Sequence, residues 1–265
     1  MSKHKTSSFN RGLYSTSMFI LTIFFFYAPI LVLLIFSFNS SKSMMWEGFS
    51  WRWYSDLIYK SPALWASFDK SLIIAFFSAL VSTFIGTIGA IGLYWYNIKF
   101  KKTLQLMTVV PMLLPEIILG VALLIFFSSA GMKLGLFTIF LAHTTFCIPY
   151  VFLIVMSRLD EFDKSIVEAA YDLGATELIV LTRIIVPICI PAIVAAFLIS
   201  ITLSLEDFVI TFFVAGPGST TLPLYIYSMI RFGVSPVINS LSVIILIATV
   251  ILSLLSLKFA KGIFK

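Results

Sequence analysis

Six apolar runs, each long enough to cross a lipid bilayer, constrain this chain more than any other feature of its sequence. A spanning helix needs roughly 20 apolar residues, because a rise of 1.5 Å per residue must cover about 30 Å of hydrocarbon. Polar breaks separate the runs, which lie at about 18–38, 71–96, 104–128, 135–157, 188–213 and 237–260. The composition, 60% hydrophobic and 11% charged, excludes an ordinary soluble domain. The sequence therefore predicts an all-α integral membrane protein with six transmembrane helices.

The first run follows a basic N-terminal segment, as the apolar core of a signal peptide does. It is longer than such a core, and no Ala-x-Ala cleavage site follows it, so we interpret it as the first spanning helix. No internal repeat or low-complexity linker divides the sequence, which predicts one transmembrane domain over residues 1–265.

The basic residues indicate how the helices are oriented. If the N-terminus is cytoplasmic, the inside segments hold Lys3, Lys5, Arg11, Lys99, Lys101, Lys102, Arg158, Lys164, Arg183, Lys258, Lys261 and Lys265. The outside segments hold only Lys42, Arg52, Lys60, Lys70, Lys133 and Arg231. The positive-inside rule therefore predicts that both termini are cytoplasmic. The same placement accounts for the net charge of +6 without nucleic acid as a partner.

Aromatic rings crowd the expected outside stretch between Asn39 and Asp69. They are Trp46, Trp51, Trp53, Tyr54, Tyr59 and Trp65. Such amphipathic rings settle at membrane interfaces, and they also stack on cations. The sequence leaves both interpretations open. Downstream, Ser61-Pro62 and Ser235-Pro236 each predict a helix start, with a serine cap before a proline in the first turn.

The sequence contains no recognisable catalytic, metal or nucleotide site. Cys147 and Cys189 lie in or beside apolar runs without a CxxC pattern, so we interpret them as inert apolar residues. HExxH and GxSxG motifs are absent, and no Gly-Lys dipeptide exists to form a phosphate-binding loop. Any ATP hydrolysis must therefore come from another polypeptide.

The segment between the fourth and fifth runs, residues 158–183, is the most charged part of the sequence. It holds six of the 12 acidic residues, namely Asp160, Glu161, Asp163, Glu168, Asp172 and Glu177. Ser165 and Glu168 have the spacing of a capping box, which predicts a short helix from Ser165 through Ala170. Gly174 then ends this helix in the left-handed conformation, and a second segment runs from Thr176 to Pro187.

Three acidic residues fall inside the predicted spans: Glu116, Glu206 and Asp207. A charge at the bilayer centre costs at least about 2.5 kcal/mol, so such residues usually face the bundle interior, a partner or a water-filled path. Glu116 follows Pro111 and Pro115, which kink a helix and free carbonyl groups that are tolerated beside a cavity. We expect all three acids to line a substrate pathway.

Asp207 and Glu206 are expected to differ in role although they are adjacent. Ser200, Ser204, Asp207 and Thr211 recur at helical spacing and form one polar stripe. Glu206 points about 100° away from that stripe. An acidic lining suits a cation and disfavours anionic cargo. His143 also lies in an apolar run, where we interpret it as a hydrogen-bonded packing residue and assign it no role.

The stretch EAAYDLGATELIVLTRIIVP, Glu168 to Pro187, resembles the EAA loop of bacterial ABC importer permeases, with Val186 in place of the usual Leu. The resemblance implies a type I ABC importer permease fold in which this loop forms a cytoplasmic coupling helix that docks on an ATPase subunit. It assigns that coupling role to Glu168, Ala169, Ala170 and Gly174.

Further stretches narrow the resemblance to polyamine (spermidine/putrescine) permease subunits. They are SFNSS at 37–41, GFSWRWY at 48–54, AHTTFCIPY at 142–150, TLSLEDFVI at 202–210 and the segment 216–239. That family commonly has two adjacent aspartates where this chain has Glu206-Asp207. The resemblance implies alternating access in a bacterial inner membrane. Its implied partners are a homologous second permease, two ATPase subunits that bind ATP and magnesium, and an external polyamine-binding protein.

Two other functions compete with a polyamine permease. The first is an ABC importer permease for another cationic or small organic solute. The second is an autonomous channel or carrier in which the EAA-like loop is coincidental. A membrane-embedded enzyme fits least, because no acid pair lies beside a nucleophile. The sequence does not distinguish between spermidine and putrescine as the preferred cargo.

Overall fold

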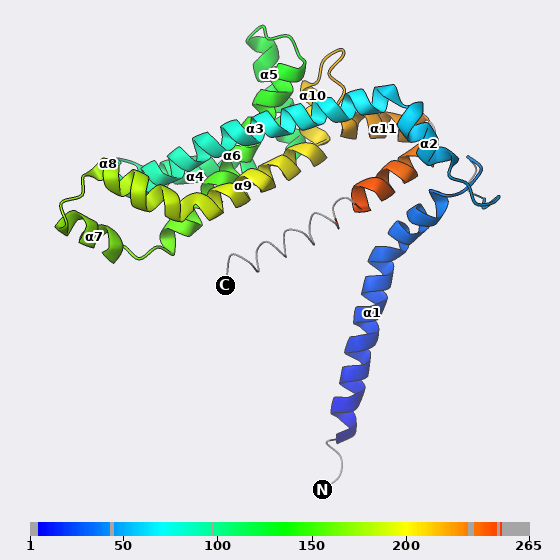
Figure 1. Cartoon of the computed structure of the whole chain (residues 1–265), viewed down its shortest axis with the longest axis horizontal. Helices are drawn as coiled ribbons and strands as arrows, with labels where there is room; N and C mark the ends of the chain where they lie inside the picture. Colours follow the sequence, from blue (N-terminus) through cyan, green and yellow to red (C-terminus); the bar gives the residue numbers. More distant parts are fainter. Residues whose placement is uncertain (1–4, 43–44, 97, 233–235, 248–249, 251–265) are drawn as a thin grey trace. The chain divides into compact units, whose positions relative to one another are not determined.

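A computed structural model describes residues 5–42, 45–96, 98–232, 236–247 and 250, and within these ranges the regular elements are all helices (Figure 1). The chain divides into two compact units. One unit consists of Met1–Pro62 and Ser228–Lys265, and the other consists of Ala63–Tyr227. The expected all-α class is confirmed for the described part of the chain.

The first unit contains α1 (Lys5–Phe36), α2 (Arg52–Tyr59) and a helix at Pro236–Ile247. The apolar part of α1, Tyr14–Phe36, is long enough to cross a membrane. Half of the last expected span, 237–260, lies outside the described residues, and so does Ser235.

Aromatic packing joins the end of α1 to α2. The rings of Phe38, Phe49, Trp51 and Tyr54 form one cluster with centroids about 5 Å apart. Trp53 is buried, and its indole N–H donates to the carbonyl of Asn39. Trp53 is therefore part of a local core, whereas Trp46, Trp51 and Tyr59 are exposed although the ring of Trp51 is in the cluster.

The second unit is a bundle in which α6 (Leu136–Asp160) contacts most of its neighbours. The long helices α3 (Pro62–Trp95) and α9 (Val186–Glu206) belong to the same bundle (Figure 1). The hydroxyl groups of Ser78 on α3 and Ser204 on α9 lie 3.2 Å apart. α3 begins at the predicted Pro62, but the hydroxyl of Ser61 donates to the carbonyl of Asp56 at the end of α2.

The expected span 104–128 is not one helix. It is divided into α4 (Lys101–Leu113) and α5 (Glu116–Ser129), which meet at an angle of 104°. Pro115 causes the break, because it lacks an N–H and disfavours helical geometry in Leu114, which is extended. A kink was predicted at this position, and the structure instead has a complete break in the helix.

The expected span 188–213 is also interrupted. α9 ends at Glu206, Asp207 is extended, and α10 (Val209–Val214) follows. The prediction that one continuous helix carries the polar stripe is therefore wrong. Its members Ser200, Ser204, Asp207 and Thr211 are nevertheless all buried.

Four described helices are each long and apolar enough to cross a membrane, and the bent pair α4–α5 makes a fifth candidate. These four are Tyr14–Phe36, Pro62–Trp95, Leu136–Asp160 and Glu177–Glu206. The last of them includes α8 (Glu177–Val180), a π-helical turn at Leu181–Ile185, and α9. Pro187 offers no N–H to the preceding turn, which accounts for the irregular hydrogen bonding there.

The charged loop forms the predicted short helix, α7 (Ser165–Asp172). Gly174 has φ of 82° and ends it, and the N–H of Ala175 closes on the carbonyl of Ala170. The predicted capping box is wrong: the N–H of Ser165 donates to the carboxylate of Asp163 at 2.9 Å and not to Glu168, and the N–H of Glu168 donates to the carbonyl of Lys164 and not to the hydroxyl of Ser165. The bond from Ser165 holds the pKa of Asp163 below its usual value.

The contact between α3 and α6 depends on Gly86. A Cβ at this position would lie 2.7 Å from the Cβ of Val151, whereas a Cβ on Gly92 of the same helix would meet nothing within 4 Å. We expect Gly86→Ala to destabilise the protein by about 1–3 kcal/mol through overpacking. Gly92→Ala, the matched control, gains helix propensity and is expected to stabilise by up to about 1 kcal/mol. Thermal unfolding in detergent measures both, and equal effects would contradict the close contact.

The start of α7 depends on the Asp163 carboxylate. Because the pKa of Asp163 is lowered on folding, its contribution to α7 is present above the unfolded pKa of about 3.9 and is lost as the pH falls below it. We expect Asp163→Ala to speed hydrogen exchange of the α7 amides about fivefold at neutral pH, and Asp163→Asn to retain the cap. Mass-spectrometric exchange measures the effect, and identical rates in the alanine variant would exclude a capping role.

Candidate functional site: an acidic cavity at two helix breaks

The structure brings the three predicted acids of the apolar runs to one cavity. This cavity has a volume of about 380 Å³ and lies between the α4–α5 break, α6 and the α9–α10 break. Its lining residues are Pro111, Met112, Leu114, Pro115, Glu116, Leu119, Phe146, Tyr150, Leu203, Glu206, Asp207, Phe208, Val209 and Ile210. Glu116 and Glu206 are 90 positions apart in sequence, so the fold and not local sequence creates the cluster.

Each acid occupies the end of a helix. Glu116 is the first residue of α5, where the positive end of the helix dipole favours a negative charge. Glu206 is the last residue of α9, and Asp207 lies in the extended link before α10. Glu116 and Glu206 are exposed, whereas Asp207 is 9% exposed. The expected difference between the two adjacent acids is therefore visible in their burial.

The carboxylate of Asp207 is held by the first turn of α10. It accepts hydrogen bonds from the N–H groups of Ile210 at 3.3 Å and Thr211 at 2.8 Å. The hydroxyl of Thr211 donates to the same carboxylate at 2.7 Å. Asp207 therefore acts as the N-terminal cap of α10 while its carboxylate borders the cavity.

His143 completes the anchoring of Asp207 from α6. Its Nε2 lies 3.2 Å from Oδ2 of Asp207 and 2.8 Å from Oγ1 of Thr211, and its Nδ1 lies 2.6 Å from Oγ of Ser204. The sequence analysis interpreted His143 as a hydrogen-bonded packing residue, and the ring is indeed hydrogen-bonded and 1% exposed. Its contact with Asp207 was not expected, because 64 residues separate the two in sequence.

The residues expected to couple to an ATPase lie on and just after α7. Val167 packs into the core on the inner side of this helix, and Ala170 is half-buried against the same core. Glu168, Ala169 and Gly174 are exposed. Leu173 was not predicted as part of this surface, although its side chain is 89% exposed beside Gly174. Ile166, Tyr171 and Leu178 of the same loop are exposed as well, and a group of exposed apolar side chains is typical of a partner surface.

Two charged side chains hold the loop against the end of α3. The ammonium of Lys164 lies 5.3 Å from the ring centre of Tyr94, a cation–π contact. Glu177, the first residue of α8, hydrogen-bonds the hydroxyl of Tyr96 and raises the pKa of that phenol. The loop is therefore fixed to α3 on both sides of α7, and the outer face of α7 is left accessible.

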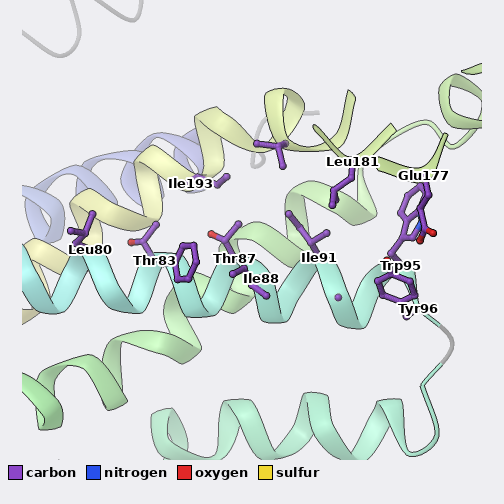
Figure 2. A pocket seen from close by; sticks show the side chains of 13 residues that line it. Leu80, Thr83, Thr87, Ile88, Ile91, Trp95, Tyr96, Glu177, Leu181 and Ile193 are labelled. Carbon is purple, nitrogen blue, oxygen red and sulfur yellow. The ribbon is translucent and has the colours of Figure 1, made fainter. Parts of the chain in front are cut away.

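A second, larger cavity of about 510 Å³ runs along α3, and Figure 2 shows its lining. Apolar side chains from α3 and from the segment Glu177–Ile193 dominate it. Its polar groups are Thr83 and Thr87, with Trp95, Tyr96 and Glu177 at one end (Figure 2). The one carboxylate of this second cavity is that of Glu177, at its end. The cavity with three acids is therefore the better match to a cation with several charges.

Comparison with known proteins supplies close relatives. The spermidine/putrescine transport system permease protein PotC of Escherichia coli (strain K12) is 40% identical over 238 residues, which cover 89% of this chain and 90% of PotC. The putrescine transport system permease protein PotI of the same strain is 43% identical over 231 residues, covering 84% of this chain and 82% of PotI. These relatives are transport permeases and not enzymes, in agreement with the expected non-catalytic role.

Solved structures share the fold at low sequence identity. A chain of a bacterial ABC transporter involved in the import of the acidic polysaccharide alginate gives a TM-score of 0.74 at 14% identity, covering 97% of this chain and 99% of that chain. A chain of the MetNI methionine ABC transporter in an inward-facing conformation gives a TM-score of 0.60 at 22% identity, covering 72% and 93%. The fold is that of an ABC importer permease.

The family described as "Binding-protein-dependent transport system inner membrane component" matches residues 82–264, which include the helices from α4 to α11 (Leu222–Phe232), the acidic cavity and the α7 loop. Together with the apolar helices, this match makes the protein a multi-pass membrane protein. The chain belongs to the family of binding-protein-dependent transport system inner membrane components.

Proposed function

We propose that this chain is the transmembrane permease subunit of an ATP-driven importer of polyamines, and that the acidic cavity is part of its translocation path. The observation that carries the proposal is the meeting of Glu116, Glu206 and Asp207 at one cavity. The fold alone does not select a cargo, because a structure of the same fold belongs to an importer of an acidic polysaccharide. The charge of the cavity and the names of PotC and PotI both favour a polycation.

The proposed topology has six spans, with the sixth formed by the C-terminal segment and both termini in the cytoplasm. The distribution of Lys and Arg supports this orientation. It places α7 on the cytoplasmic side, where Ala169 and Leu173 offer an accessible face to an ATPase subunit. Two such subunits would bind ATP and magnesium, and a homologous permease and an external polyamine-binding protein would complete the complex.

A permease for another small solute is the second candidate. The putative 2-aminoethylphosphonate transport system permease protein PhnV of Salmonella paratyphi A is 27% identical over 249 residues. Its named solute carries an amine together with a phosphonate. Three carboxylates at one cavity disfavour an anionic group, so this relative supports the fold and the importer class more than the cargo.

Uptake of labelled putrescine and spermidine into vesicles containing the full complex tests the cargo. We expect Asp207→Asn to lower uptake about tenfold or more, because it removes the anchored charge of the cavity. Glu116→Gln and Glu206→Gln remove exposed charges and should have smaller effects. Glu161→Gln, an exposed acid outside the cavity, is the control. Unchanged uptake by Asp207→Asn would remove this residue from the path, and transport by the purified chain without an ATPase would favour a channel or carrier.

Co-purification tests the docking face of α7. We expect Ala169→Arg and Leu173→Asp each to reduce the ATPase recovered with the permease about tenfold, because each places a charge in a closely packed apolar contact. Lys133→Asp changes an exposed residue between α5 and α6, at the other end of α6, and should have no effect. Full ATPase recovery with both α7 variants would show that this face is not the docking surface.

A further inference from the structure

His143 is the buried titratable group that the proposed transport path does not yet use. It lies within α6, is 1% exposed, and contacts residues on both sides of the α9–α10 break. Ser204 lies before the break and Thr211 lies after it. The ring therefore bridges the break between α9 and α10. Among the residues that the structure describes, it lies beside the one buried acid of the cavity, Asp207.

We propose that His143 is a positioning residue for the acidic cavity: it fixes the carboxylate of Asp207 at the α9–α10 break. The inference rests on the proposed transport of a cation, and it adds a positioning residue to that function. His143 does not border the cavity itself, so it acts through Asp207.

The geometry around Nε2 requires a proton on that atom. Asp207 accepts from Thr211 Oγ1 at 2.7 Å, which uses the single hydroxyl proton of Thr211. The oxygens facing Nε2, at 2.8 and 3.2 Å, can then only accept. A proton on Nε2 therefore serves both of them and ties the carboxylate to α6.

The other side of the ring is held by two hydroxyl groups. The hydroxyl of Ser204 donates to Nδ1 over 2.6 Å, which leaves Nε2 as the ring nitrogen that carries the proton. Oγ of Ser78 on α3 lies 3.2 Å from Oγ of Ser204, and Ser78 donates to the carbonyl of Ile74 at 2.6 Å. Both ring nitrogens of the buried imidazole therefore have partners, which fixes the orientation of the ring toward Asp207.

Two substitutions separate positioning from packing. His143→Leu fills the space but removes the hydrogen bonds of both ring nitrogens, and we expect it to lower the initial uptake rate about tenfold at saturating binding protein. His143→Gln can place an amide N–H near the Nε2 position, and should recover uptake to within about threefold of the wild type. Thr145→Ala, on the exposed face of α6, is the matched control. Equal rates for leucine and wild type, at equal amounts of assembled complex, would overturn the proposal.

A spectroscopic measurement tests the contact between His143 and Asp207 without depending on which cargo is transported. The chain has two histidines, His4 and His143, so ¹⁵N-histidine labelling in a His4→Ala background gives one imidazole to observe. We expect its Nε2 resonance to shift in Asp207→Asn. An unshifted resonance would refute the pairing even if the cargo is a polyamine. A shifted resonance without polyamine uptake would leave the pair intact and reject the proposed cargo.

Discussion

The polar groups exposed by two broken helices must find partners inside an apolar bundle, and the rest of the structure depends on how they do so. At the α9–α10 break, the N–H groups of Ile210 and Thr211 have no carbonyl partner in the preceding turn. The carboxylate of Asp207 accepts hydrogen bonds from both of them. A carboxylate used in this way has a fixed position, because its bonds to the backbone move only if the helix moves. The break therefore creates the anchored charge of the cavity, and the anchored charge stabilises the break.

The cavity and the α7 loop belong to one continuous bundle. α6 carries His143 near its middle, and its C-terminal residues Val155 and Leu159 pack in the core that also contains Val167 of α7. α9 contributes Leu203 and Glu206 to the cavity, and Cys189 and Ala196 to the core beside α7. Under the proposed function, a displacement of α7 would thus reach the cavity through two packed helices.

The sequence predicted the features that local pattern determines. Apolar length located the helices, and Gly174 and Pro62 marked an end and a start because backbone geometry favours glycine and proline there. The break at Asp207 was missed, since a polar residue of this kind continues a helix or caps the next one according to distant partners. His143 was undervalued for the same reason: its contacts come from 61 and 68 residues away, and no local spacing encodes them. The acids were found because burying charge is costly wherever it occurs.

The unequal burial of the three acids suits a flexible cation better than a rigid one. One carboxylate, Asp207, is fixed by four hydrogen-bonding contacts, whereas Glu116 and Glu206 are exposed and free to adopt several rotamers. A polyamine has several ammonium groups on a chain of rotatable bonds. A single fixed anion can hold one ammonium group, and the longer glutamate side chains can follow the others as the chain moves. A cavity of three fixed anions would bind one conformation tightly and release it slowly, which opposes transport because conduction requires weak, multi-site contacts.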